Sequence, residues 1–290
     1  MRHPQEHPWF QRLGGAVGAT MDRFVDDEIR ARVEAMDIHA GTHGYDGWGG
    51  SKLASTRALG VARFFYRRYF RVEADGLENV PEGRCLLIGN HSGQLPIDGL
   101  IVAAALALDG HPPRYVHAMI ERFFAGIPFV GVGMSRVGQQ IGLPQHCERL
   151  LTRDDAAVLV FPEGQRGSGR VVWDRYKLLQ FGSGFMRLAL RTGTPIVPFG
   201  FVGGEEMAMS FSRMEPIARR LGLPYLPLSP TLLPLPMPAK CMLNIGAPLR
   251  FEGSGNEPDD VVLGYIDEVK SSIADQIAVG RARRRHPYFG

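Results

Sequence analysis

The chain has 290 residues, 44% of them hydrophobic and 22% charged, a globular composition that excludes a mainly disordered chain. Its length fits one α/β domain with terminal extensions as well as two domains. The net charge is only +3, so the overall charge identifies no partner, and the three cysteines are far apart without a CxxC pair, which argues against a disulfide framework or a zinc site.

The N-terminal residues give no sign of export or of a membrane span. Residues 1–10 lack the apolar core and the cleavage site of a secretory signal. No run reaches the roughly 20 apolar residues that cross a bilayer. The longest apolar stretches, Leu100–Leu108 and Ile196–Val202, have the length of core elements. The scattered cysteines favour a reducing compartment. We therefore expect any contact with a membrane to be peripheral.

Two helices are predicted before the main domain. Apolar residues recur at helical spacing over residues 15–37, a glycine-rich break covers residues 41–50, and a second helix is predicted from about Lys52 to Phe70. This second helix mixes aromatic residues with basic ones and has no acid, as a helix lying on anionic lipid would. The alternative is a helix packed on the core with its arginines in solvent. The basic residues are Lys52, Arg57, Arg63, Arg67, Arg68 and Arg71.

From residue 73 onward, apolar strands alternate with helical patterns. Strands are predicted at residues 85–89, 115–118, 157–161, 195–202 and 241–246, and helices at residues 97–108, 145–152, 182–192 and 258–279. This alternation predicts an α/β fold, an αβα sandwich around a mixed, largely parallel sheet with an N-terminal amphipathic helical extension. We expect a helical segment at residues 1–72 and the main domain at residues 73–290.

His91 follows the first of these strands directly. Ligands of open α/β sheets bind at the carboxyl ends of strands, so His91 stands where a catalytic base would be. Pro96 suits the first position of the next helix, and Asp98 falls in its first turn. The loop is short enough to return the Asp98 carboxylate to the imidazole, which would fix the tautomer and leave the other nitrogen to accept a proton. The helix dipole alone also favours an aspartate there, and a lone histidine is more often structural.

A second group of polar residues follows the strand at residues 157–161. The sequence Pro-Glu-Gly at this strand end predicts a turn that exposes the Glu163 carboxylate, with the Arg166 guanidinium close behind. Arg166 has the geometry to clamp a phosphate or a polar headgroup, and Gly164 lets backbone approach a ligand closely. The alternative is a plain turn with a surface ion pair.

Together the two segments resemble the glycerolipid (PlsC-like) acyltransferase superfamily. The resemblance is carried by the NH…D pattern of His91 and by FPEGxR around Glu163, and it extends to GTPIVPF at Gly193–Phe199. It covers roughly residues 75–250. The most specific part is FPEG with the downstream IVPF. The resemblance implies that residues 73–290 are a glycerolipid acyltransferase-like catalytic domain and that residues 1–72 associate with a membrane.

Two departures from the family pattern bear on the acceptor. Six residues separate His91 from Asp98 where the family usually has four, a form more similar to the branch of transmembrane-protein-68 and diacylglycerol-acyltransferase-like proteins. In the second block, residues 128–142, Gln139 and Gln140 stand where phosphate-acceptor members have an arginine, and Arg136 aligns elsewhere. The second departure favours a neutral acceptor, such as mono- or diacylglycerol, over a phosphorylated one.

The resemblance implies an O-acyltransferase that moves a fatty acyl group from an acyl thioester to a glycerolipid hydroxyl, either of a neutral mono- or diacylglycerol or of a lysophospholipid. His91 is the expected general base and Asp98 its orienting partner, while backbone N–H groups near Gly93 or Gly164 are expected to stabilise the oxyanion. No nucleophile elbow is visible, so direct transfer is expected, without a metal or a cofactor. The expected substrate-binding residues are Asn90, Gly93, Glu163, Gly164 and Arg166.

The implied partners are acyl-CoA or acyl carrier protein, a lipid acceptor, and an anionic membrane surface that contacts the Lys52–Arg71 region. The implied location is peripheral, on the cytoplasmic side of a membrane, and no nucleic-acid module is recognisable. Residues 221–239 contain six prolines among leucines, which suits a covering loop, or alternatively a wall of an acyl tunnel or a membrane-dipping loop. Two alternative functions stay open: an inactive lipid-binding or scaffold protein of the same fold, and an acyl thioesterase.

Overall fold

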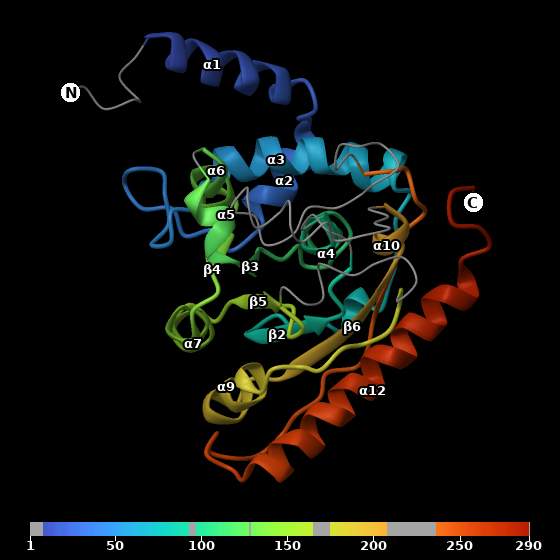
Figure 1. Cartoon of the computed structure of the whole chain (residues 1–290). Helices are drawn as coiled ribbons and strands as arrows, with labels where there is room; N and C mark the ends of the chain where they lie inside the picture. The colour runs from blue at the N-terminus through green and yellow to red at the C-terminus, as the bar shows by residue number, and fades with distance from the viewer. Residues whose placement is uncertain (1–7, 93–96, 128, 165–174, 208–235, 290) are drawn as a thin grey trace, which may run out of the picture.

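The structure, a computed structural model, describes residues 8–92, 97–127, 129–164, 175–207 and 236–289. Within these ranges, seven strands form one sheet in the order β1-β7-β6-β2-β5-β3-β4 (Figure 1). Neighbouring strands run parallel except β6 and β7, which are antiparallel. The strands are β1 (Glu73–Asp75), β2 (Cys85–Gly89), β3 (Val116–Ile120), β4 (Gln140–Ile141), β5 (Ala157–Val160), β6 (Ile196–Val202) and β7 (Met242–Ile245).

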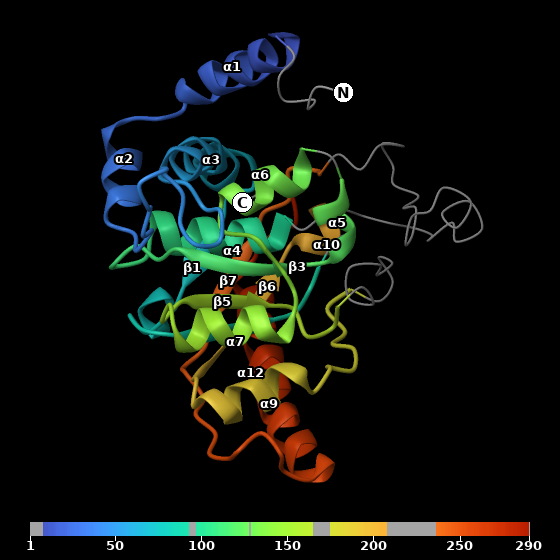
Figure 2. The same ribbon diagram turned by 90° about the vertical axis from the view of Figure 1, so that its left-hand side faces the viewer.

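Helices cover both faces of this sheet, as Figure 2 shows. Alternate residues of β2 point to opposite faces, so Leu87 packs with the helices of one face and Leu86 and Ile88 with those of the other. Strands β2 and β6 are buried along their whole length, as expected for strands covered on both sides. This arrangement confirms the predicted αβα sandwich. The helices are α2 (Asp27–Glu34), α3 (Lys52–Phe64) and α4 (Ile97–Leu108) on the first face, and α7 (Pro144–Thr152), α9 (Gly184–Thr192) and α12 (Asp259–Arg283) on the second.

The predicted helix at residues 15–37 is two helices in the structure. Helix α1 (Pro8–Asp22) ends before a turn, and α2 begins after Asp26. Asp26 has an extended backbone, and its Oδ1 accepts a hydrogen bond from the N–H of Ile29 at 3.1 Å. An aspartate in this position caps a helix start, so it divides an apolar pattern that continues across the break.

Four of the five aromatic residues between Phe64 and Phe70 face the core, and the fifth, Phe64, is exposed. Helix α3 continues into a π-helical turn, Phe65–Tyr69, in which Tyr66 is fully buried, and Phe70 directly after it is buried as well. Rings of this segment pack against residues of α2 and α4, so α2 and the segment from Lys52 to Val72 share one apolar core with the sheet. The described residues contain no helix long and apolar enough to cross a membrane.

Most basic residues of this segment are paired within the chain. Five of the six basic side chains between Lys52 and Arg71 have partners in the structure. Their acidic partners come from other segments, so the sequence of this segment alone does not show them. Lys52 pairs with Glu34, Arg57 with Asp22, Arg63 with Asp26 and Glu28, and Arg67 with Asp109, while Arg71 donates to the backbone carbonyls of Tyr69, Pro238 and Tyr288. The positive charge available to a membrane is therefore smaller than the sequence predicts.

Several short elements after the strands are not predicted by the sequence pattern. They are too short for hydrophobic periodicity to identify, since each spans at most two helical turns. Residues 208–235, which hold most of the proline-rich segment, lie outside the described residues. The short elements are α5 (Arg122–Gly126), α6 (Val130–Arg136), α10 (Gly204–Met207) and the 3-10 turn Leu77–Asn79.

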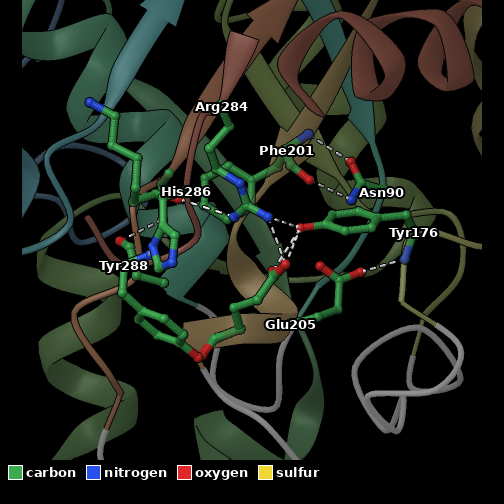
Figure 3. A network of polar contacts seen from close by, with 11 residues as sticks. Asn90, Tyr176, Phe201, Glu205, Arg284, His286 and Tyr288 are labelled. Atoms are coloured by element: carbon green, nitrogen blue, oxygen red, sulfur yellow. Dashed lines mark hydrogen bonds and ion pairs between the residues drawn. The ribbon is translucent and has the colours of Figure 1, made fainter. Parts of the chain in front are cut away.

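A buried polar cluster connects the segment after α12 to the end of β6 (Figure 3). Arg284 and Glu206 form an ion pair of 2.6 Å in which both side chains are buried. The Tyr176 hydroxyl donates to Glu206 at 2.7 Å and accepts from Arg284 at 2.8 Å. Burial and the charges of Glu206 and Glu205 raise the pKa of Tyr176, so its hydroxyl keeps the proton that it donates. The Tyr288 hydroxyl donates to the backbone carbonyl of Glu206 at 3.2 Å.

Replacing Arg284 with methionine is expected to destabilise the fold by about 3–5 kcal/mol, because Glu206 would keep a buried charge without its cation. The matched control is Arg283→Met, which removes the neighbouring, exposed pair of Arg283 with Asp75. That change should cost at most about 1 kcal/mol. Urea unfolding at neutral pH measures both values, and similar midpoints for the two variants would contradict the assignment.

Candidate functional site

The site begins at the end of β2, where the chain leaves the sheet. A Cβ atom at Gly89 would lie 2.3 Å from the Phe199 ring, so only glycine lets the two neighbouring strands pack here. The next side chain, Asn90, is fully buried and bonds the backbone of Phe201 twice (Figure 3). Its Nδ2 donates to the Phe201 carbonyl at 2.9 Å, and its Oδ1 accepts from the Phe201 N–H at 2.8 Å. The amide thus extends the pairing of β2 with β6 by one residue and fixes the position of the backbone from which His91 projects.

His91 and Asp98 are in direct contact despite the longer loop between them. The His91 Nδ1 lies 2.6 Å from the Asp98 Oδ2. The same carboxylate accepts the N–H of Ser92 at 2.8 Å through Oδ2 and the N–H of Gly99 at 2.8 Å through Oδ1. Asp98 is fully buried in the first turn of α4, whereas 12% of the His91 side chain is exposed. The carboxylate therefore favours the tautomer with the proton on Nδ1, which leaves the lone pair on Nε2.

Phe161 holds the imidazole from a neighbouring strand end. Its ring stacks on His91 with centroids 4.4 Å apart and planes inclined by 15°. Phe161 in turn meets the ring of Phe199 edge to face at 6.0 Å. Because β2 and β5 run parallel in register, the residues that follow them are brought side by side. From the sequence, Phe161 is predicted only as the end of a strand and part of a motif. Its ring contact with His91 is not predicted.

The electrostatic surroundings of His91 favour its protonated form. Burial alone lowers the pKa of His91, but the charge of Asp98 and its hydrogen bond outweigh burial and hold the pKa above its ordinary value of 6.5. The charges of Glu163 and Glu121 add to this rise. His91 is therefore a stronger base than a histidine in water, and its neutral form becomes available as the pH rises.

Glu163 lies in the turn after Phe161, but the structure buries its carboxylate, which the sequence had placed on the surface. The side chain is 2% exposed, and its Oε2 accepts the N–H of Leu179 at 3.2 Å. Gly164 has a left-handed backbone with φ of +56° and open space where a Cβ would stand. Its N–H donates to the Phe161 carbonyl at 3.1 Å, so this donor closes the turn. Burial changes the expected role of Glu163 from a surface ligand to a fixed negative charge near His91.

Three of the residues named from the sequence lie outside the described residues. They are Gly93 and Pro96 in the loop between His91 and Asp98, and Arg166 after Gly164. Their expected contacts with an oxyanion or a headgroup stay predictions.

The second block contacts the glycine-rich segment at residues 41–50. The Gln140 amide donates to the Trp48 carbonyl at 3.1 Å. The Arg136 guanidinium donates to the Gly49 carbonyl at 3.1 Å and lies 3.7 Å from the centre of the Tyr45 ring. These contacts hold the segment to α6 and β4, so Arg136 has a structural partner within the chain.

The described residues offer neither a reactive cysteine nor a group of metal ligands. Burial raises the pKa of Cys85 to about 12 and that of Cys147 to about 11, and all three thiols are buried, which makes them poor nucleophiles at neutral pH. Within the described ranges, no three His, Cys, Asp or Glu side chains are grouped as ligands of a metal ion.

Comparison with known proteins agrees with this geometry. The family model named Acyltransferase matches residues 71–202. An uncharacterized protein of Mycobacterium tuberculosis is 35% identical in an alignment of 243 positions that covers 79% of this chain and 67% of that protein. A 1-acyl-sn-glycerol-3-phosphate acyltransferase from Limnanthes alba is 28% identical over 137 residues, 46% of this chain and 45% of the plant protein.

The fold also matches a solved structure. The 1-acyl-sn-glycerophosphate (LPA) acyltransferase PlsC from Thermotoga maritima superimposes with a TM-score of 0.54 at 16% identity, over 81% of this chain and 84% of that chain. At this identity the likeness concerns the fold alone. The family match covers His91, Asp98 and Glu163 together with the strands that carry them. The sequence matches thus show that this chain belongs to the glycerolipid acyltransferase superfamily and is an acyltransferase.

Proposed function

We propose that this enzyme transfers a fatty acyl group from an acyl thioester to the hydroxyl of a glycerolipid, with His91 as the general base. The observation that carries the proposal is the His91–Asp98 contact of 2.6 Å at the carboxyl end of β2. A buried carboxylate on Nδ1 and a partly exposed ring make Nε2 the nitrogen that meets substrate. The donor is acyl-CoA or acyl carrier protein, acting as a co-substrate, and the proposed reaction uses no further cofactor.

In the proposed mechanism, Nε2 of His91 removes the proton of the acceptor hydroxyl while its oxygen attacks the thioester carbonyl. The carbon–sulfur bond then breaks, and the leaving thiolate takes a proton back from the imidazolium. Asp98 stabilises the imidazolium during both steps, as the carboxylate of a catalytic triad does. The stack with Phe161 and the Asn90 bonds to Phe201 keep the ring and its loop in one position.

The acceptor is proposed to be a neutral mono- or diacylglycerol. Support comes from the second block, where Gln140 and Arg136 are occupied by the segment at residues 45–49. The second candidate is a lysophospholipid, as in phospholipid biosynthesis, because the Limnanthes alba relative is named for 1-acyl-sn-glycerol-3-phosphate. Gly93, Gly164 and Arg166 are proposed to contact the substrates, with Arg166 at the headgroup.

The enzyme is proposed to work on the cytoplasmic side of a membrane as a peripheral protein. In the Lys52–Arg71 region, Phe64 and Arg68 form a surface together with Arg23 and Phe24, and this surface suits anionic lipid. Its two arginines have no carboxylate partner among the described residues, and both aromatic rings are exposed. A cavity of about 580 Å³ opens between these side chains.

Incubation with radiolabelled acyl-CoA and four acceptors tests the reaction. The acceptors are monoacylglycerol, diacylglycerol, lysophosphatidate and glycerol-3-phosphate. Label is expected in the product of a neutral acceptor, which is diacylglycerol from monoacylglycerol or triacylglycerol from diacylglycerol. His91→Ala should lower the rate about 10²- to 10⁴-fold, the usual contribution of a general base. The matched control is His39→Ala, since His39 forms a similar contact of 2.6 Å with Asp37 but on the exposed surface.

Each result of that assay selects one function. Label in lysophosphatidate or glycerol-3-phosphate products would replace the neutral acceptor with the phosphorylated one. Label only in free fatty acid would establish the thioesterase. Absence of turnover with both acyl-CoA and acyl carrier protein donors would leave the lipid-binding or scaffold protein.

The pH dependence tests the charge near His91. Because the base must be neutral, kcat/KM should rise with pH through the pKa of His91, which lies above 6.5. Glu163→Gln removes a negative charge that favours the imidazolium, so its acidic limb should move to lower pH. Glu121→Gln should move the limb in the same direction by less, since Glu121 contributes less to the rise. A limb that stays in place, or moves to higher pH, in Glu163→Gln would refute this electrostatic role.

A further inference from the structure

An apolar lobe, formed by α5, Phe129 and α6, projects from the fold directly after β3. Four large side chains in this lobe are 37% to 60% exposed, although apolar residues of this size are usually buried. Exposed apolar groups that gather in one patch mark an interaction surface, whereas single ones do not, and these four fall within a short stretch of chain, residues 123–132. The four are Phe123, Phe129, Val130 and Val132.

The backbone of the lobe is built to hold these side chains outward. Phe129 has a positive φ of +67°, which is strained for an aromatic residue, and its ring is the most exposed of the four. At Gly131 a Cβ atom would lie 2.4 Å from the Ala125 carbonyl oxygen, so the two short helices cross closely only because glycine is there. A strained backbone and a close helix crossing both keep these apolar groups exposed, which indicates that the exposure has a function.

The charge of the lobe suits lipid. Residues 122–136 contain two arginines and no acid. Arg136 is bound to Gly49 and Tyr45, while Arg122 stands at the start of the lobe. Aromatic and aliphatic tips with a basic border are typical of elements that enter the headgroup and upper acyl region of a membrane.

The lobe lies beside the catalytic site. It starts one residue after Glu121, whose charge acts on His91. At its other end, the Arg136 carbonyl accepts the N–H of Ser51 at 2.9 Å, which joins α6 to the beginning of α3. Figure 2 shows α6 next to α3 on the outer side of α4. A membrane that met the lobe would thus come to the edge of the site where a lipid acceptor has to arrive.

We infer that the apolar lobe inserts into the lipid bilayer and holds the His91 site at its surface. This inference rests on the proposed function, which requires the site to reach a membrane lipid. The contact it names, the apolar lobe, differs from the basic surface around Arg68. Insertion of apolar side chains requires neither anionic lipid nor low salt, whereas attraction of arginines to a membrane requires both.

A fluorescent label placed on the lobe tests the insertion. The environment-sensitive dye NBD would be attached at Phe129→Cys, and for comparison at Leu263→Cys on the exposed face of α12; the three native cysteines are buried and stay unlabelled. Vesicles of zwitterionic phosphatidylcholine should shift the emission of the Phe129→Cys label to the blue, at 0.1 M and at 1 M salt alike. The Leu263→Cys label should not respond. An unresponsive label at both positions would overturn the inference.

A second measurement uses vesicle flotation with matched triple variants. Phe123→Ser with Phe129→Ser and Val132→Ser should lower partitioning into phosphatidylcholine vesicles about tenfold or more, given the apolar area removed. Val261→Ser with Leu263→Ser and Val279→Ser, at side chains that are 38% to 49% exposed on α12, should leave it unchanged. Equal partitioning of the two variants would overturn the inference.

Two further outcomes separate the alternatives. A blue shift that grows with protein concentration in the absence of vesicles would mean that a second copy covers the lobe, and would overturn lipid insertion. A lipid-dependent shift in a protein that transfers no acyl group would support the lobe while refuting the proposed reaction, because neither the label nor flotation depends on turnover.

Discussion

The buried Asp98 carboxylate is the group around which the site is arranged. A carboxylate without exposure to water is costly unless its oxygens are hydrogen-bonded. Here two backbone N–H groups and the His91 ring meet that need. One of the N–H groups belongs to Ser92, directly after His91, so the same interaction that compensates the charge also folds the loop back on itself. Helix α4, the histidine loop and the ring orientation are thereby fixed together.

The sheet supplies the rest of the geometry. Parallel pairing of β2 with β5 and with β6 brings three strand ends to one edge. Phe161 arrives from one side of His91 and Phe201 anchors the loop from the other. None of these contacts requires a long flexible side chain, so the ring is positioned by rigid elements. A group that transfers protons needs this kind of support, because even a small displacement of a catalytic group lowers the reaction rate strongly.

The sequence predicted the features that depend on neighbouring residues. Strand and helix types, the sandwich and the His91–Asp98 pair all follow from local patterns, and the family match over residues 71–202 includes this pair in its range. Contacts between distant segments could not be predicted. The burial of Glu163 and the stack of Phe161 depend on strand register. The division of the first helix is a different case: it depends on a local cap, Asp26, inside an apolar pattern that continues across the break.

The helix that begins at Lys52 shows the same limit most clearly. By its own composition this helix is basic and aromatic, which is typical of a helix that lies on a membrane surface. In the structure, acids of α1, α2 and the end of α4 neutralise most of its cations, and the core takes most of its rings. A window of sequence gives the charge of a segment but not the charge of the surface that the segment forms.

The cluster of Arg284, Tyr176 and Glu206 has a consequence for how the protein is made. Glu206 follows the central strand β6, yet its cation comes from a residue 78 positions later in the chain. During synthesis, β6 and α10 therefore leave the ribosome long before Arg284 does, with a polar pair still incomplete beside the forming sheet. The nascent domain therefore has to wait for the segment after α12 before this edge of the sheet can close.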